Sequence, residues 1–237
     1  NISKKKKFIF KNKKTLKLRY QKYRNRLEFK QNNLIRLLNN HPLIVLIRLE
    51  DDFFKISQKR ENLFLKINKL SNYGIKNIEI GWDSNPEWAR LISEIRINFN
   101  SINLGVASIS TRQSLDSILS LDLNYSMSPL FNKDIHLSAI EHNQLVIPGI
   151  SNIESYKEAI NLGYKILKIF PASKLGINFI KELRNDQKKD IFLIGAGGIK
   201  SKNINKLLSC GYDALVIGRE LKDQIPDKEL TQWLKDY

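Results

Sequence analysis

Two charged residues lie where the sequence is otherwise apolar, and their types could carry chemistry. Lys168 stands in the run Ile166–Phe170, and Glu79 stands between Ile78 and Ile80. Burial disfavours the ammonium form of a lysine and the ionised form of a glutamate, so both pKa values would move toward neutrality. A neutral amine can attack a carbonyl and form an imine, and a carboxyl group beside it can transfer protons. The pair is therefore a candidate for imine chemistry on a carbonyl compound.

Both residues also have a structural interpretation, which the pattern leaves open. Lys168 could extend its ammonium group out of the end of a strand, or Glu79 could neutralise it as a buried ion pair. Lys165 is the competing lysine of the same run. It begins the run, so we expect it to face the opposite end of the strand from Lys168.

The elements that would position these residues form a regular alternation. Short apolar runs, rich in β-branched residues, alternate with segments of helical periodicity, which predicts parallel strands joined by crossover helices. Continuous apolar character is typical of a sheet buried on both faces. Eight such runs predict an α/β fold, a single (β/α)8 TIM barrel, with an open doubly wound sheet as the alternative fold. The runs are Leu43–Leu49, Asn77–Gly81, Ile102–Val106, Asn124–Ser128, Gln144–Pro148, Tyr164–Phe170, Ile191–Gly195 and Asp213–Gly218.

Polar residues and glycines gather late in these runs or just after them. In a barrel, functional residues lie at the carboxyl ends of the strands, so these positions are the candidates for a site. The Gly197-Gly198 pair leaves backbone N–H groups able to approach an anion, although two tight turns would give the same pattern. The strand-end residues are Arg48, Glu79, Ser108, Ser128-Pro129, Pro148-Gly149, Lys168, Gly197-Gly198 and Gly218.

The net charge of +16 is concentrated at the beginning of the chain. Residues 1–40 hold 14 Lys and Arg against one acid, Glu28, so the rest of the chain carries only +3. We therefore predict a basic, flexible tail over residues 1–19 and a barrel over residues 20–237, with a leading helix from Tyr20 to Leu38. A solvated tail is favoured over a targeting segment or one that binds RNA or a membrane surface. We accordingly do not expect nucleic acid as a partner.

Several other classes of protein are disfavoured by composition. No run approaches the roughly 20 apolar residues of a membrane span, and no apolar segment of the secretory type follows the basic start. The single cysteine, Cys210, permits no internal disulfide and suggests a reducing compartment, so we expect a cytoplasmic protein. His41, His136 and His142 do not form a close metal-ligand set, so no metal or other cofactor is expected.

The order of these motifs resembles the 2-keto-3-deoxy-6-phosphogluconate (KDPG) and 4-hydroxy-2-oxoglutarate aldolases. The resemblance extends from about Pro42 to Leu221 and rests on Ile78–Ile80, Ser128-Pro129, Ile147–Ser151, Leu167–Ala172 and Gly197–Ile199. It implies a class I aldolase with Lys168 as the Schiff-base lysine and Glu79 as the general acid and base. It also implies a homotrimer that binds a small 2-keto acid. The substrate-binding residues would be Arg48, Ser108, Pro129, Phe170, Gly197, Gly198, Gly218 and Arg219.

Three residues depart from that family's pattern, all where substrate anions would be held. Asp83 replaces an Arg or Thr near the keto-acid carboxylate, Ala196 replaces a Thr before the glycine pair, and Glu220 replaces a Ser near the phosphate. Arg219 could compensate for Glu220. The sequence therefore leaves open whether the substrate is phosphorylated. It also leaves two alternatives, a phosphate-sugar epimerase or isomerase barrel, and a non-catalytic barrel whose basic tail binds nucleic acid.

Overall fold

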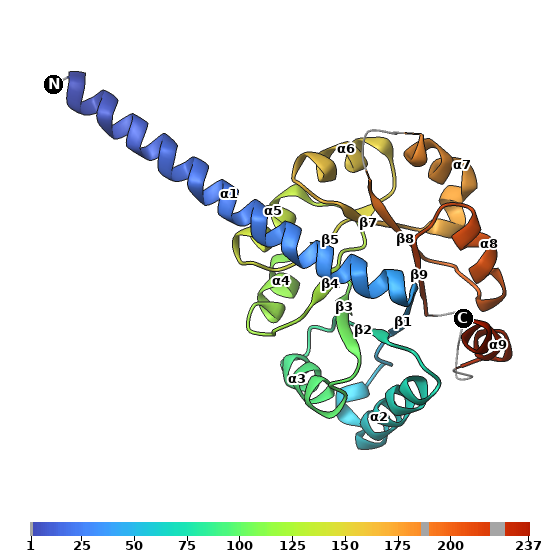
Figure 1. The fold of residues 1–237 in the computed structure, drawn as a ribbon. Helices are drawn as coiled ribbons and strands as arrows, with labels where there is room; N and C mark the ends of the chain where they lie inside the picture. Colours follow the sequence, from blue (N-terminus) through green and yellow to red (C-terminus); the bar gives the residue numbers. More distant parts are fainter. Residues whose placement is uncertain (1, 186–189, 219–225) are drawn as a thin grey trace.

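The fold is a parallel β-barrel surrounded by helices (Figure 1). The computed structural model describes residues 2–185, 190–218 and 226–237. The strands follow the order β5-β4-β3-β2-β1-β9-β8-β7-β6, and each pair is parallel. The two end members, β5 and β6, are separated in sequence only by Pro148, so the chain itself joins the two ends of the sheet. The predicted TIM barrel is confirmed.

All eight expected strands are present, and the fifth is divided in two. Pro148 has no N–H to contribute to a ladder, and its carbonyl instead accepts a hydrogen bond from the backbone of Lys168. The strands are β1 (Leu43–Ile47), β2 (Asn77–Gly81), β3 (Asn103–Ala107), β4 (Tyr125–Met127), β5 (Val146–Ile147), β6 (Gly149–Ile150), β7 (Ile166–Ile169), β8 (Phe192–Ala196) and β9 (Ala214–Ile217).

Helices follow the strands on the outside of the barrel (Figure 1). They are α2 (Ser57–Asn72), α3 (Trp88–Asn98), α4 (Arg112–Ile118), α5 (Lys133–Glu141), α6 (Ile153–Asn161), α7 (Ala172–Arg184), α8 (Ile204–Ser209) and α9 (Lys228–Asp236), with 3-10 turns at Phe53–Lys55 and Ser201–Asn203. The sequence analysis did not anticipate α9. Its signals were present, because Asp227 caps the helix and Leu230 and Trp233 are buried one turn apart.

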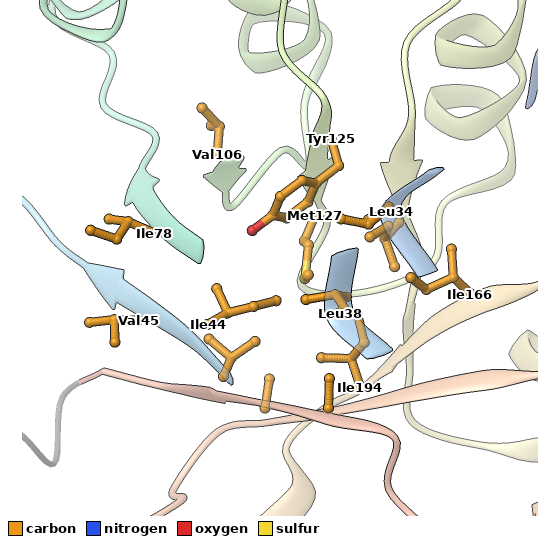
Figure 2. Close-up of a cluster of buried hydrophobic side chains, with 14 of the residues drawn as sticks. Leu34, Leu38, Ile44, Val45, Ile78, Val106, Tyr125, Met127, Ile166 and Ile194 are labelled. Atoms are coloured by element: carbon orange, nitrogen blue, oxygen red, sulfur yellow. The ribbon is translucent and has the colours of Figure 1, made fainter. Parts of the chain in front are cut away.

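Helix α1 (Ile2–Asn40) crosses the end of the barrel where the strands begin (Figure 1). Figure 2 shows Leu34 and Leu38 of this helix among the side chains of Ile44, Ile166 and Ile194. The helix is longer than the predicted Tyr20–Leu38 segment, and the boundary at residue 19 stays a prediction. In the part of the chain that the structure describes, no helix is long and apolar enough to cross a membrane.

Three asparagines align the strands that lead to one side of the site. Asn103 donates a hydrogen bond to Asn77 (3.0 Å), and Asn124 donates one to Asn103 (2.6 Å). Asn77 in turn donates to the carbonyls of His41 and Leu43. Because the buried amides of Asn77 and Asn103 need these partners, the ladder favours a single register among β2, β3 and the start of β4.

Candidate active site

A cavity of about 450 Å³ opens at the carboxyl ends of the strands. The predicted catalytic and substrate-binding residues that the structure describes all line it, and Arg219 lies outside the described residues. Three other strand-end candidates, Ser128, Pro148 and Gly149, are not part of its wall. Leu46, Ala107, Pro171, Ser173, Lys174, Ala196, Ile199 and Val216 complete its wall. The cavity walls bring together Arg48, Glu79, Ser108, Pro129, Lys168, Phe170, Gly197, Gly198 and Gly218.

Lys168 is buried in the wall of the cavity rather than extended into solvent. It pairs with Gly149 of β6 and Ile194 of β8, and only 7% of its surface is exposed. Its Nζ lies 5.1 Å from the centroid of the Phe170 ring. Among the described residues it forms no ion pair within 4.0 Å, so a closed salt bridge with Glu79 does not account for its burial.

The surroundings of Lys168 make its amine easier to deprotonate. Burial lowers its pKa, the negative charge of Glu79 opposes that change, and the positive charge of Arg48 adds to it. Lys165 has the opposite placement, because it is exposed and pairs with Glu28 of α1 at the closed end. Of the two lysines of this strand, Lys168 alone faces the cavity.

Glu79 lies in the middle of β2, beside Leu46 of β1 and Gly105 of β3. It is 1% exposed, and its Oε1 has no hydrogen-bond partner among the described residues. Burial raises the pKa of this carboxyl group, while the positive charges of Lys168 and Arg48 oppose the rise. The pKa values of the buried amine and the buried carboxyl therefore move toward each other, which suits proton exchange between them and a bound compound.

Arg48 and Ser108 form one pole of the cavity. Arg48 follows β1, and its Nη1 donates a hydrogen bond to Ser108 Oγ at 3.2 Å. Ser108 follows β3 and has a φ of 73°, a left-handed conformation that costs a residue other than glycine about 1–3 kcal/mol and is common at functional sites. A guanidinium group with a hydroxyl beside it can bind a carboxylate.

The glycine pair and the start of α7 form a second pole. Gly197 and Gly198 have φ values of 91° and 72°, and a Cβ at Gly198 would lie 2.3 Å from Ser173 Oγ. Ser173 and Lys174 line the cavity here and are exposed at its rim. The sequence analysis missed both, although two polar residues directly after a strand-end Phe-Pro-Ala segment were a usable signal.

The three departures from the family pattern are placed differently in space. Asp83 lines a separate hollow with Asp51 and Asp52, and its Oδ1 accepts a hydrogen bond from the backbone of Asn85. Asp83 therefore does not line this cavity, although the resemblance places its position near the keto-acid carboxylate. Ala196 lies in the cavity wall, whereas Glu220 is outside the described residues.

A buried serine–histidine contact supports the strand beside Lys168, and the sequence analysis missed it as well. Ser128 Oγ lies 3.1 Å from His136 Nε2 and accepts a hydrogen bond from the backbone N–H of Gly149. Gly149 is the register partner of Lys168, so this contact connects β4 to the strand that borders the lysine. Among the described residues no three His, Cys, Asp or Glu side chains are grouped to hold a metal ion.

Comparisons with known proteins agree with this architecture. The chain is 24% identical over 156 residues to a 2-dehydro-3-deoxy-6-phosphogalactonate aldolase of Escherichia coli (strain K12), which covers 65% of this chain and 76% of the relative. A KDPG aldolase structure from Zymomonas mobilis ATCC 29191 superposes with a TM-score of 0.70 at 18% identity, over 87% of this chain and 95% of the other. A Legionella pneumophila KDPG aldolase, solved with pyruvate as a covalent carbinolamine intermediate, superposes with a TM-score of 0.67 at 17% identity, over 82% and 93%.

The family match is longer than the 156-residue alignment with the Escherichia coli relative. The sequence model of the KDPG and KHG aldolase family matches residues 43–231, which includes every strand of the barrel. This family match favours a lyase over the two alternatives that the sequence left open, a phosphate-sugar epimerase or isomerase and a non-catalytic barrel. The chain therefore belongs to the KDPG and KHG aldolase family, and it is an aldolase.

Proposed function

We propose that this aldolase is a class I enzyme that cleaves a 4-hydroxy-2-keto acid through a Schiff base on Lys168. The observation that carries the proposal is the position of Lys168, buried in the cavity wall with a lowered pKa, beside the carboxyl group of Glu79. A desolvated lysine is the usual nucleophile of imine-forming enzymes. The covalent pyruvate adduct of the Legionella pneumophila relative is chemistry of the same kind on the same fold.

The proposed reaction uses one nucleophile and one proton carrier. The Lys168 amine adds to the C2 carbonyl to form a carbinolamine, and Glu79 donates the proton with which the hydroxyl leaves as water. The Glu79 carboxylate then accepts the proton of the C4 hydroxyl as the C3–C4 bond breaks. The C4 fragment leaves as an aldehyde, and the bond's electron pair forms an enamine on C3. Protonation of C3 and hydrolysis of the imine release pyruvate and regenerate the free amine.

The two poles of the cavity support a substrate with an anion at each end. Arg48 and Ser108 would hold the keto-acid carboxylate, and Gly197, Gly198 and Lys174 would face the distal group. KDPG and 4-hydroxy-2-oxoglutarate both have this form, with a phosphate or a second carboxylate at the distal end. We further propose a homotrimer, as the resemblance implies, and a cytoplasmic location, as the single cysteine suggests. Light scattering against the 27.6 kDa chain mass would test the oligomeric state.

The test is reductive trapping. The folded protein is incubated with millimolar pyruvate and borohydride, and the intact mass and a peptide map are recorded. We expect one reduced adduct on Lys168, none on Lys168→Ala, and an unaffected yield on Lys165→Ala, because Lys165 lies at the opposite end of the strand. A folded wild-type protein that acquires no adduct would refute the imine mechanism.

A further inference from the structure

A buried tyrosine lies in the same layer of the barrel as Glu79. Glu79 of β2 is the register partner of Gly105 in β3, and Gly105 is the partner of Tyr125 in β4. Register partners on neighbouring strands point their side chains to the same face of a sheet. Tyr125 is 1% exposed, and Figure 2 shows its ring directed from β4 into the barrel interior.

Gly105 is what allows the tyrosine ring to reach across β3. A Cβ at this position would lie 2.4 Å from Tyr125 Cζ and 2.7 Å from its Cε2, so any side chain would occupy the space of the ring. The ring therefore lies over the glycine, and its tip approaches the next strand, where the neighbouring side chain is Glu79.

Two buried polar atoms with unused hydrogen-bonding capacity lie in this layer. Tyr125 Oη and Glu79 Oε1 are both buried, and neither has a partner in good geometry among the described residues. They are near enough for each group to change the pKa of the other. Burial and the charge of Glu79 raise the pKa of Tyr125, so the phenol stays protonated and can act as a donor at neutral pH.

We propose that Tyr125 is a positioning residue for Glu79, whose carboxylate accepts a hydrogen bond from the phenol and is held facing Lys168. Its effect on turnover rests on the proposed Schiff-base function, whereas its effect on Glu79 does not. A donor to the ionised form favours that form, so Tyr125 acts against the burial that holds the Glu79 proton.

The other groups that face Glu79 set the background for this effect. Lys168 from β7 and Arg48 from the end of β1 place positive charges near the carboxylate, and β3 contributes only Gly105 in this layer. Unlike these two cations, the phenol of Tyr125 can donate a hydrogen bond to the carboxylate without adding charge to the cavity. Its removal should move the titration of Glu79 and leave the two cations in place.

The experiment compares Tyr125→Phe with Tyr164→Phe. Tyr164 is also 1% exposed, and its hydroxyl is also buried without a partner among the described residues, but burial alone raises its pKa. The infrared band of the protonated Glu79 carboxyl, identified by its loss in Glu79→Gln, is titrated with pH. We expect the Tyr125→Phe midpoint to rise by about one pH unit, the value of one hydrogen bond to a charged group, and the Tyr164→Phe midpoint to match wild type. Coincident midpoints for all three proteins would overturn the proposal.

A second measurement avoids dependence on the folding of Tyr125→Phe. In wild-type protein with ¹³C-labelled tyrosine, the Tyr125 Cζ resonance should shift as Glu79 titrates, and this shift should vanish in Glu79→Gln. A Tyr125 resonance that does not respond to Glu79 would also reject the contact. Trapping of pyruvate on wild-type Lys168 is scored separately, so failure of the Schiff base and failure of the tyrosine contact give different results.

Discussion

Gln31 of α1 accepts a hydrogen bond from the backbone N–H of Lys165 at 2.6 Å and donates one to the carbonyl of Gly163 at 3.1 Å. Gln31 is fully buried, so its amide is committed to the start of β7. The strand that begins there presents Lys168 to the cavity at its other end. The helix across the closed end of the barrel thus helps to set the position of the proposed nucleophile.

The part of α1 under the barrel should matter more for stability than the segment before it. Leu34→Ala should lower the free energy of unfolding by about 2–5 kcal/mol, because Leu34 is 1% exposed and its truncation leaves a cavity in the core. Deletion of residues 1–19 should leave stability and turnover nearly unchanged. Urea unfolding followed by circular dichroism measures the stability of both variants, and the steady-state rate of pyruvate release measures the turnover of the deletion. A deletion as costly as Leu34→Ala would show that residues 1–19 pack on the barrel.

The reactivity of Lys168 should respond in opposite directions to its two charged neighbours. Its lowered pKa makes the amine reactive at a lower pH than a free lysine, and the rate should fall as pH drops through that pKa. Glu79→Gln removes the charge that raises this pKa and should shift the inflection to lower pH. Arg48→Met removes a charge that lowers it and should shift the inflection upward. The rate of acylation of Lys168 by an uncharged reagent, followed by peptide mass spectrometry, gives the profile. Shifts of the same sign in both variants would contradict this account.

Turnover should depend on Glu79 far more than binding does. Glu79→Gln keeps the shape of the side chain but cannot transfer a proton, so we expect kcat to fall by about 10²–10⁴-fold. Burial of a neutral amide in place of a carboxyl should not impair folding. Steady-state rates of pyruvate release, with thermal melting as the control, test this. Wild-type turnover in Glu79→Gln would assign the residue to structure.

Lys174 should contribute to the distal end of the substrate. It is exposed at the cavity rim, where a charge pair is worth about 0.2–1 kcal/mol, so Lys174→Ala should lower kcat/KM for KDPG by no more than about fivefold. Pyruvate has no distal anion, and its trapping on Lys168 should be preserved. Lys181→Ala, in the last turn of the same helix, is the matched control. An equal loss in both variants would mean that the charge acts at long range only.

Substrate choice should be less dependent on phosphate than the family pattern suggests. Ala196 in the cavity wall offers no hydroxyl, and Glu220 adds a negative charge to the segment where the resemblance expects a serine. We expect kcat/KM for KDPG to exceed that for 4-hydroxy-2-oxoglutarate by less than about a thousandfold, roughly 4 kcal/mol. Glu220→Ser should increase the ratio. A wild-type ratio above that limit would indicate that Arg219 binds the phosphate.

The sequence by itself determined the barrel and the end of it at which the site lies. Alternating apolar runs and helical segments indicate parallel strands with crossover helices. Because such strands are buried on both faces of the sheet, a lysine or a glutamate inside one of them is unusual and marks a candidate site. Position within one run was enough to separate Lys168 from Lys165, because a strand's two ends face opposite ends of a barrel.

Only the tertiary structure decided which side chains meet across strands. The register of β2, β3 and β4 places Tyr125 beside Glu79 through the space left by Gly105, and it brings Ser128 to the backbone of Gly149. The structure also places Asp83 in a different hollow. It brings Ser173 to the glycine pair, where its backbone N–H donates a hydrogen bond to the carbonyl of Gly197. Sequence patterns report how each segment is buried, whereas contacts between segments depend on strand register and on the volume of every intervening residue, which no single segment contains.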